Sequence, residues 1–469
     1  MIIESKSAAP WGLLAILLIG TFMGTLGNSM VSIALPELKE HFAVPLTSVV
    51  WSITLYTLTF SVLMPVFSVL GPAIGLKRLY VCGMICVCTG SILSVLAHNF
   101  ILFLFARILT GIGVGTFLPS IMWVIANRFP SEYQGQATGY WALVNSLGHA
   151  IGPTLGGFFL QFMDWRGIFL INIPLGLISI LLALRLFPNN SRVTVKNFDT
   201  AGAISLAIFA FSAMLAITAT VKKGISSPQT LGLWAAALSA LIFISVYERK
   251  RTKPFVDLNL FANRKYVAAI LAISTQAFSQ FGLLVSLPVF LINIHQINQQ
   301  SAGLLVMVMT MTMSIISPIA GRLTDKWGSK IVCQLGIVLI IAGASYFALF
   351  RMDNFQTWVW VSFMLGLIIF GSGFGFIQSA STVSVIQSVA SEKTGPATGF
   401  FHMIRFINAS LGATVIGIIL ETNSSGMLHG YYQGFLVILA ISLFTLPFTL
   451  SMAKRKNKEE IGVNISGIS

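Results

Sequence analysis

The sequence predicts an all-α polytopic membrane protein whose two halves share one plan. Hydrophobic residues make up 56% of the 469 residues and charged residues only 9%, which is more apolar than soluble domains of this length. Many segments of about 18 residues or more contain no charged residue, and a helix of that length can cross a bilayer. A polar segment followed by an apolar run also occurs twice, once from Gly135 and again from Gly395.

About fourteen apolar runs are expected to cross the membrane as helices. They lie near residues 11–35, 48–70, 79–97, 100–127, 136–161, 167–187, 200–220, 229–247, 266–293, 301–320, 331–350, 357–386, 397–420 and 431–453. The first run is expected to be retained, because no small-residue cleavage pattern follows it.

Two pairs of similar segments identify the halves. Residues 131–140 match 391–400, and residues 65–77 match 318–330. Duplicated halves in a membrane protein imply a pathway at their interface that opens to one side and then to the other. The predicted organisation is a six-helix half (1–190), two inserted membrane helices (191–250), a second six-helix half (251–453) and a cytoplasmic tail (454–469).

Most of the basic residues fall in alternate loops, as Lys77, Arg128, Arg249, Arg322 and Lys330 do. This asymmetry places both termini in the cytoplasm. The net charge of +14 is therefore interpreted as an orientation signal and not as a sign of nucleic-acid binding. The four cysteines lie within apolar runs without a metal-binding pattern, so packing is the favoured interpretation.

Polar stripes within the spans indicate which helices line a pathway. Thr21, Thr25, Asn28 and Ser32 recur on one face of the first span, and Thr54, Thr57 and Ser61 do so on the second. For single Ser and Thr residues, helix-to-helix hydrogen bonding is the favoured alternative. Larger polar groups cost more to bury and favour a cavity. The predicted cavity residues are Asn28, Tyr56, Arg107, Asn145, Gln276, Gln280, Gln378, His402 and Arg405.

The central parts of the spans contain no Asp or Glu. Arg107 and Arg405 must therefore reach water, a carbonyl group or a substrate, because an uncompensated charge in the membrane is costly. His149 and His402 are the only central groups that titrate near neutrality, which makes them possible proton carriers. The alternative for each His is an ordinary hydrogen-bonded packing role.

Glycines recur every fourth residue in the fifth predicted span, at Gly148, Gly152 and Gly156, and Gly157 follows. Such a strip lets another helix approach closely, and Pro153 bends the span. We expect a pliable gating helix whose glycine strip packs against the other half.

Several motifs resemble the major facilitator superfamily. The pattern from Gly148 through Gly152 and Pro153 to Gly157 resembles its fifth-helix antiporter signature, and Arg107 with the glycines after it resembles its fourth-helix motif. Two segments resemble the cytoplasmic loop motif of this superfamily. The first contains Gly75, Lys77 and Arg78, and the second contains Gly321, Asp325, Gly328 and Lys330. The segments 165–176 and 254–261 and the pair Leu35-Pro36 resemble the fourteen-span drug:proton antiporter branch (EmrB/QacA type).

This resemblance implies multidrug efflux by alternating access, with protons as the coupling ion. We expect a monomer in the cell membrane that binds a small-molecule substrate and no nucleic acid. No cofactor is expected, and no nucleophile–base constellation or nucleotide-binding loop favours an enzyme or a receptor.

Three positions depart from the family pattern. Gly27 occupies the place of the usual first-span Asp, Pro72 the place of the Asp in the first loop motif, and Thr110 the place of the fourth-helix Gln. Uptake or facilitated transport of a neutral or anionic metabolite, such as a vitamin, is therefore a second hypothesis, because Asn, Gln and Arg without acids suit that chemistry.

Overall fold

The computed structural model describes residues 10–187, 199–251, 254–255, 257–297, 299–349, 357–390, 393–422 and 427–452. Over these ranges every regular element is helical, so the all-α prediction is confirmed. The predicted boundary at 190 and the tail 454–469 fall outside the described residues.

The first half contains α1 (Trp11–Phe42), α2 (Leu46–Val49), α3 (Trp51–Ile74), α4 (Leu76–Val95), α5 (Phe100–Arg128), α6 (Gln134–Met163), α7 (Gly167–Leu170) and α8 (Asn172–Leu186). The inserted pair is α9 (Thr200–Lys223) and α10 (Pro228–Glu248). The second half contains α11 (Asn259–Ala262), α12 (Arg264–Val289), η1 (Phe290–Ile294), α13 (Gln299–Trp327), α14 (Ser329–Leu349), α15 (Thr357–Ser388), α16 (Thr394–Thr422), α17 (Met427–Thr445) and η3 (Leu446–Ser451).

Thirteen helical segments in the described ranges are long and apolar enough to cross a membrane. The 30-residue α6 is not among them, since Gln, Asn, His and Thr side chains lower its hydropathy. It nevertheless runs through the bundle, packed against α1 and α13. With α6 included, the described chain forms the predicted bundle of fourteen long helices.

Local sequence explains where several helices begin and turn. The side chains of Asn99, Asp199 and Asn263 accept hydrogen bonds from free N–H groups at the starts of α5, α9 and α12, as helix N-caps commonly do. Gly75 and Gly328 have φ angles of 90° and 84°. Only glycine adopts this backbone region without strain, so these two positions allow the tight turns into α4 and α14.

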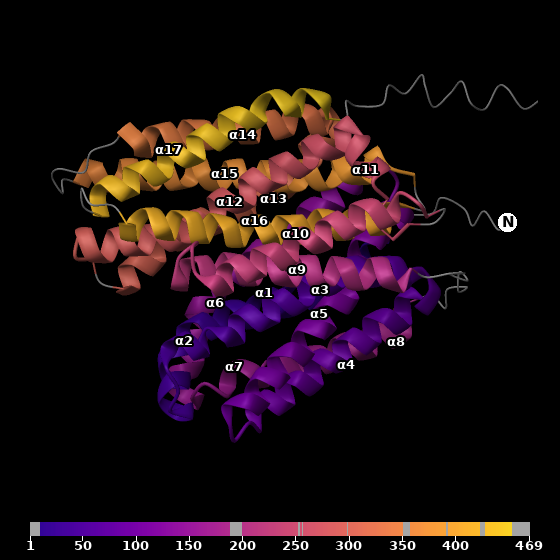
Figure 1. Ribbon diagram of the computed structural model, residues 1–469, viewed down its shortest axis with the longest axis horizontal. Coiled ribbons are helices and arrows are strands. Elements are labelled where there is room, and N and C mark those ends of the chain that lie inside the picture. Colours follow the sequence, from indigo (N-terminus) through magenta and orange to yellow (C-terminus); the bar gives the residue numbers. More distant parts are fainter. Residues whose placement is uncertain are drawn as a thin grey trace, which may run out of the picture.

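The two halves lie side by side with the inserted helices along their seam. Figure 1 shows the first half in indigo and purple, the second half in orange and yellow, and α9 and α10 between them. Each half has its own apolar core. Between the halves, α6 packs on α13 and α3 packs on α16, while α9 contacts both α3 and α16.

The repeated glycine segments form both of these crossings between the halves. A Cβ on Gly139 would lie 2.6 Å from the Ser317 carbonyl oxygen of α13. In the second copy, a Cβ on Gly399 would lie 2.5 Å from the Ser68 Oγ of α3. The repeat is thus placed where helices of opposite halves approach most closely.

The glycine strip of α6 packs differently from our expectation. A Cβ on Gly148 would lie 2.0 Å from Thr25 Oγ1, and one on Gly152 would lie 2.5 Å from Ser29 Cβ. Both partners belong to α1, and Gly156 faces Met30 of the same helix. The prediction that the strip contacts the other half is therefore wrong. Helical periodicity identified a close contact but not the neighbouring helix that makes it.

Candidate functional site

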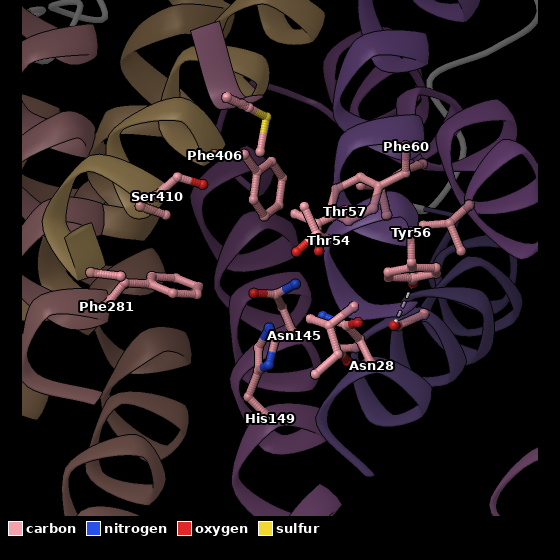
Figure 2. A pocket seen from close by; sticks show the side chains of 18 of the residues that line it. Asn28, Thr54, Tyr56, Thr57, Phe60, Asn145, His149, Phe281, Phe406 and Ser410 are labelled. Atoms are coloured by element: carbon pink, nitrogen blue, oxygen red, sulfur yellow. Dashed lines mark hydrogen bonds between the residues drawn. The ribbon is translucent and has the colours of Figure 1, made fainter. Parts of the chain in front are cut away.

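A cavity of about 240 Å³ lies between the halves. Four helices of the first half (α1, α3, α5 and α6), two of the second (α12 and α16) and the inserted α9 contribute lining residues. Figure 2 shows Phe281, Phe406 and Ser410 on one side of it, facing Thr54 and other residues of the first half. The cavity therefore occupies the interface where the repeat predicted a pathway.

The lining combines apolar walls with uncharged hydrogen-bonding groups. Phe60, Phe281, Phe406 and Met214 supply much of the apolar surface, and Thr, Ser, Asn and Tyr side chains supply the polar groups. No Asp or Glu is among the lining residues, and His149 is the one imidazole among them. Such a surface binds an apolar molecule and orients its polar groups without providing a counter-charge for a cation.

Three of the nine predicted cavity residues, Asn28, Tyr56 and Asn145, line this cavity. Parts of both hydroxyl stripes also reach it, namely Thr21 and Thr25 of α1 and Thr54 and Thr57 of α3. The stripes reach the cavity because side chains three or four positions apart share a helix face.

Arg107 lies behind the cavity wall and is buried, with 1% of its surface exposed. One terminal nitrogen donates to Asn28 Oδ1 at 3.1 Å, and its Nε donates to the Ser52 carbonyl oxygen at 3.1 Å. The guanidinium carbon stands 4.5 Å from the centre of the Tyr56 ring, a cation–π distance. Tyr56 in turn donates to the Gly24 carbonyl oxygen at 2.6 Å. Arg107 therefore holds two lining side chains in place.

We expect Arg107→Ala to destabilise the folded protein by about 1–3 kcal/mol, because it leaves buried acceptors without donors. Transport should fall as well, since Asn28 and Tyr56 lose their support. Thermal unfolding in detergent and flux in proteoliposomes measure the two effects. Arg185→Ala, which removes an exposed Arg of α8, is the control. Wild-type stability and flux in Arg107→Ala would contradict this role.

The other five predicted cavity residues lie outside the lining, buried in the second half. Gln276 Nε2 donates to Gln280 Oε1 at 2.6 Å within α12. Arg405 donates to Gln378 Oε1 at 3.3 Å. The His402 ring centre lies 5.2 Å from that of Trp141 in α6. The structure thus gathers these residues beside the cavity and not on its surface.

Asp325 joins the halves at one end of the bundle. Its carboxylate accepts hydrogen bonds from the backbone N–H groups of Gly135 (2.7 Å) and Gln136 (2.8 Å) at the start of α6. A carboxylate is stabilised at a helix N-terminus by free N–H groups and by the helix dipole. Gly321 touches Gly135 directly, because a Cβ on it would meet the Gly135 carbonyl oxygen. This end of the bundle, where Asp325 binds the start of α6, is called the latch end below.

The remaining loop-motif residues also lie at the latch end. Lys77 donates to the Leu184 carbonyl oxygen at 2.6 Å, while Arg78 is exposed and Lys330 is half-buried. Gly75 and Gly328 make the turns described above. The first copy of the motif has Pro72 where the second has Asp325, so the acidic latch belongs to the second copy alone.

Sequence reasoning missed the contribution of α9 and of the aromatic residues. Met214 and Thr218 of α9 line the cavity, as do Phe60, Phe281 and Phe406. The inserted helix has no polar stripe that distinguishes one face, and Phe residues occur throughout the apolar runs. No pattern in the sequence separates these side chains from those that face lipid.

A family model described as the Major Facilitator Superfamily matches residues 17–413. The chain belongs to the major facilitator superfamily. The riboflavin transporter RibZ of Clostridioides difficile is 30% identical to it over 403 residues, which is 86% of each chain. The multidrug transporter protein MdtP of Bacillus subtilis is 28% identical over 426 residues, covering 91% of this chain and 78% of MdtP. Membership of this superfamily confirms the coarser part of the resemblance.

A solved structure shares the fold. The human organic anion transporter MFSD10 superposes with a TM-score of 0.69, covering 94% of this chain and all of MFSD10, at 16% sequence identity. At this identity the similarity concerns the fold alone. The protein is a multi-pass membrane protein of a transporter superfamily, and a small-molecule substrate follows from that membership.

Proposed function

We propose that the protein exports amphipathic organic compounds by alternating access and belongs to the fourteen-span drug:proton antiporter branch. The observation that carries this proposal is the cavity between the halves, whose phenylalanine side chains and Met214 suit varied apolar molecules. Relatives named as multidrug transporters support the same activity. A monomer suffices in this proposal, because helices of one chain supply the whole lining.

We propose that the latch end faces the cytoplasm, because Lys77, Arg78, Arg322 and Lys330 gather at its helix ends. Asp325 holds α6 against α13 at this end, and Gly395 and Gly399 hold α16 against α3 there. The structure then corresponds to a form closed toward the cytoplasm. Export requires this form to alternate with one in which both crossings separate.

The lining favours neutral or anionic substrates. A cation in a cavity of low dielectric constant requires a counter-charge, and the lining supplies none. Neutral aromatic compounds find ring partners in Phe60, Phe281 and Phe406 and hydrogen bonds from Asn28 and Asn145.

Uptake of one vitamin-like metabolite is the second candidate function. Two observations favour it: the acid-free lining and the similarity, over 86% of each chain, to a protein named as a riboflavin transporter. Export and uptake use the same cavity and differ in the direction of net flux.

Inside-out membrane vesicles with an imposed proton gradient separate the two candidates. We expect vesicles containing the protein to accumulate neutral aromatic dyes when their interior is acidic, several-fold above vesicles without it. Riboflavin is tested in the same vesicles. Loss of preloaded riboflavin, without flux of any dye, would favour uptake and contradict the export proposal.

We predict that His149 carries the proton when transport is driven by a proton gradient. This side chain lines the cavity, whereas His402 is buried outside the lining. His149→Gln should abolish gradient-driven accumulation while downhill flux of the same dye continues. His98→Gln, which changes an exposed histidine between α4 and α5, is the control and should keep driven accumulation. Undiminished accumulation by the His149→Gln protein would rule out this carrier.

A further inference from the structure

Four buried side chains with nitrogen donors meet beside the cavity, where the two halves join. Trp141 comes from α6, Gln378 from α15, and His402 and Arg405 from α16; they are 1%, 0%, 2% and 4% exposed. Contacts link them, since Arg405 donates to Gln378, the rings of Trp141 and His402 touch, and His402 lies one turn before Arg405. We call this group the Arg405 cluster.

Arg405 has fewer hydrogen-bond partners than Arg107, and its ring contact, with Phe406, is at 5.6 Å from the ring centre. Its one hydrogen bond to a side chain is the 3.3 Å contact with Gln378 Oε1, and its Nε–H has no acceptor among the described residues. Neither of the ion pairs in the described chain includes Arg405. Arg107, by contrast, is held by Asn28, Ser52 and Tyr56. Burying a guanidinium with so few hydrogen-bond acceptors costs free energy unless a ligand supplies the missing acceptors.

The unpartnered atoms of the cluster are all nitrogens. They are Arg405 Nε, Gln378 Nε2, Trp141 Nε1 and His402 Nε2. The first three are donors, and a histidine Nε2 can carry a proton. The cluster therefore has an excess of donors and a positive charge but lacks acceptors. The complementary group is an anion with several oxygen atoms, such as a carboxylate, a sulfonate or a phosphate.

The cluster lies directly against the cavity wall. Phe406, next to Arg405 in the chain, lines the cavity, and so does Ala409, one helical turn further on. Phe406 meets Phe60 edge to face at 4.7 Å between ring centres, and the centre of its ring lies 5.6 Å from the guanidinium carbon of Arg405. The Phe406 ring therefore contacts both the cluster and the opposite cavity wall.

We propose that the Arg405 cluster is a subsite for the anionic group of a substrate whose apolar part occupies the cavity. This inference rests on the proposed function for its physiological setting and identifies amphipathic organic anions as the substrates that the protein binds most tightly. The guanidinium supplies the charge, Gln378 orients it, and Phe406 separates the subsite from the cavity when no ligand is bound.

Equilibrium binding of a matched probe pair tests the subsite without requiring transport. The probes are radiolabelled 1-naphthoate and its neutral amide, 1-naphthamide, with the purified full-length protein in detergent. We expect wild type to bind 1-naphthoate roughly 10-fold or more tightly than 1-naphthamide, as charge-assisted hydrogen bonds provide. Arg405→Gln should reduce this ratio to about one and leave 1-naphthamide binding within a few-fold. Arg185→Gln, which removes an exposed Arg, should keep the wild-type ratio.

A second variant guards against misfolding of Arg405→Gln. Gln378→Leu keeps the charge, removes one donor and the amide that orients Arg405, and should weaken 1-naphthoate several-fold more than 1-naphthamide. An unchanged ratio in a folded Arg405→Gln protein would overturn the inference. So would the absence of saturable 1-naphthoate binding by wild type up to about 1 mM, the weak end of specific binding. Binding through Arg405 without flux of either probe would support the subsite and count against the proposed function.

Discussion

Gly152→Leu should sharply reduce the amount of folded protein. A Cβ at this position would lie 2.5 Å from Ser29 Cβ and 2.7 Å from its Oγ, which donates to the His149 carbonyl oxygen at 3.0 Å. A leucine must therefore push α1 and α6 apart. Overpacking of this kind costs about 2 kcal/mol or more. The separation would also distort the cavity, because Thr25 and Asn28 of α1 and Asn145 and His149 of α6 line it.

The same helix supplies the control for this variant. A Cβ on Gly157 would meet no other side chain or distant backbone atom of the described chain within 4 Å, so Gly157→Leu should fold at nearly the wild-type level. Size-exclusion profiles of both proteins from whole-membrane extracts, followed by thermal unfolding, compare them directly. Equal yields and melting temperatures for the two variants would show that the strip does not determine the α1–α6 packing.

Asp325→Asn should shift the protein away from the form that is closed at the latch end. The carboxylate accepts two backbone hydrogen bonds, from Gly135 and Gln136. An asparagine offers one oxygen and points an NH₂ group at the second N–H. Losing charge-assisted bonds of this kind costs about 1.5–3 kcal/mol, which changes the equilibrium between the two forms roughly 10- to 100-fold. Turnover should fall, while substrate affinity stays within a few-fold.

Cysteine accessibility at the other crossing reports this shift. Ser68 is buried against Gly399, so Ser68→Cys in a cysteine-free background should react with a water-soluble thiol reagent only when the latch end opens. Asp325→Asn should raise the labelling rate about 10-fold or more. Asp164→Asn, which changes a surface carboxylate far from the latch, should leave it unchanged. Equal rates in both proteins would exclude Asp325 as a latch.

Much of the fold follows from the sequence because the bilayer imposes simple rules. A helix must be about 20 residues long and apolar to cross it, and the runs that satisfy this rule correspond to the observed helices. The repeated segments at Gly135 and Gly395 predicted two halves in contact, and these residues lie at the crossings between them. The polar stripe formed by Thr21, Thr25 and Asn28 indicated which side of α1 faces the cavity, because a polar face of a helix in lipid must meet water or protein.

The tertiary structure decided what each polar or small residue touches. Sequence patterns treated Arg107 and Arg405 alike, yet only Arg107 is well supplied with acceptors. They also assigned the strip from Gly148 to Gly156 to the other half, whereas it meets α1. They gave no sign that Met214 of α9 reaches the cavity. The physical reason is that periodicity within one helix fixes which side chains share a face. The neighbour that the face meets depends on how all the helices pack, which no single segment encodes.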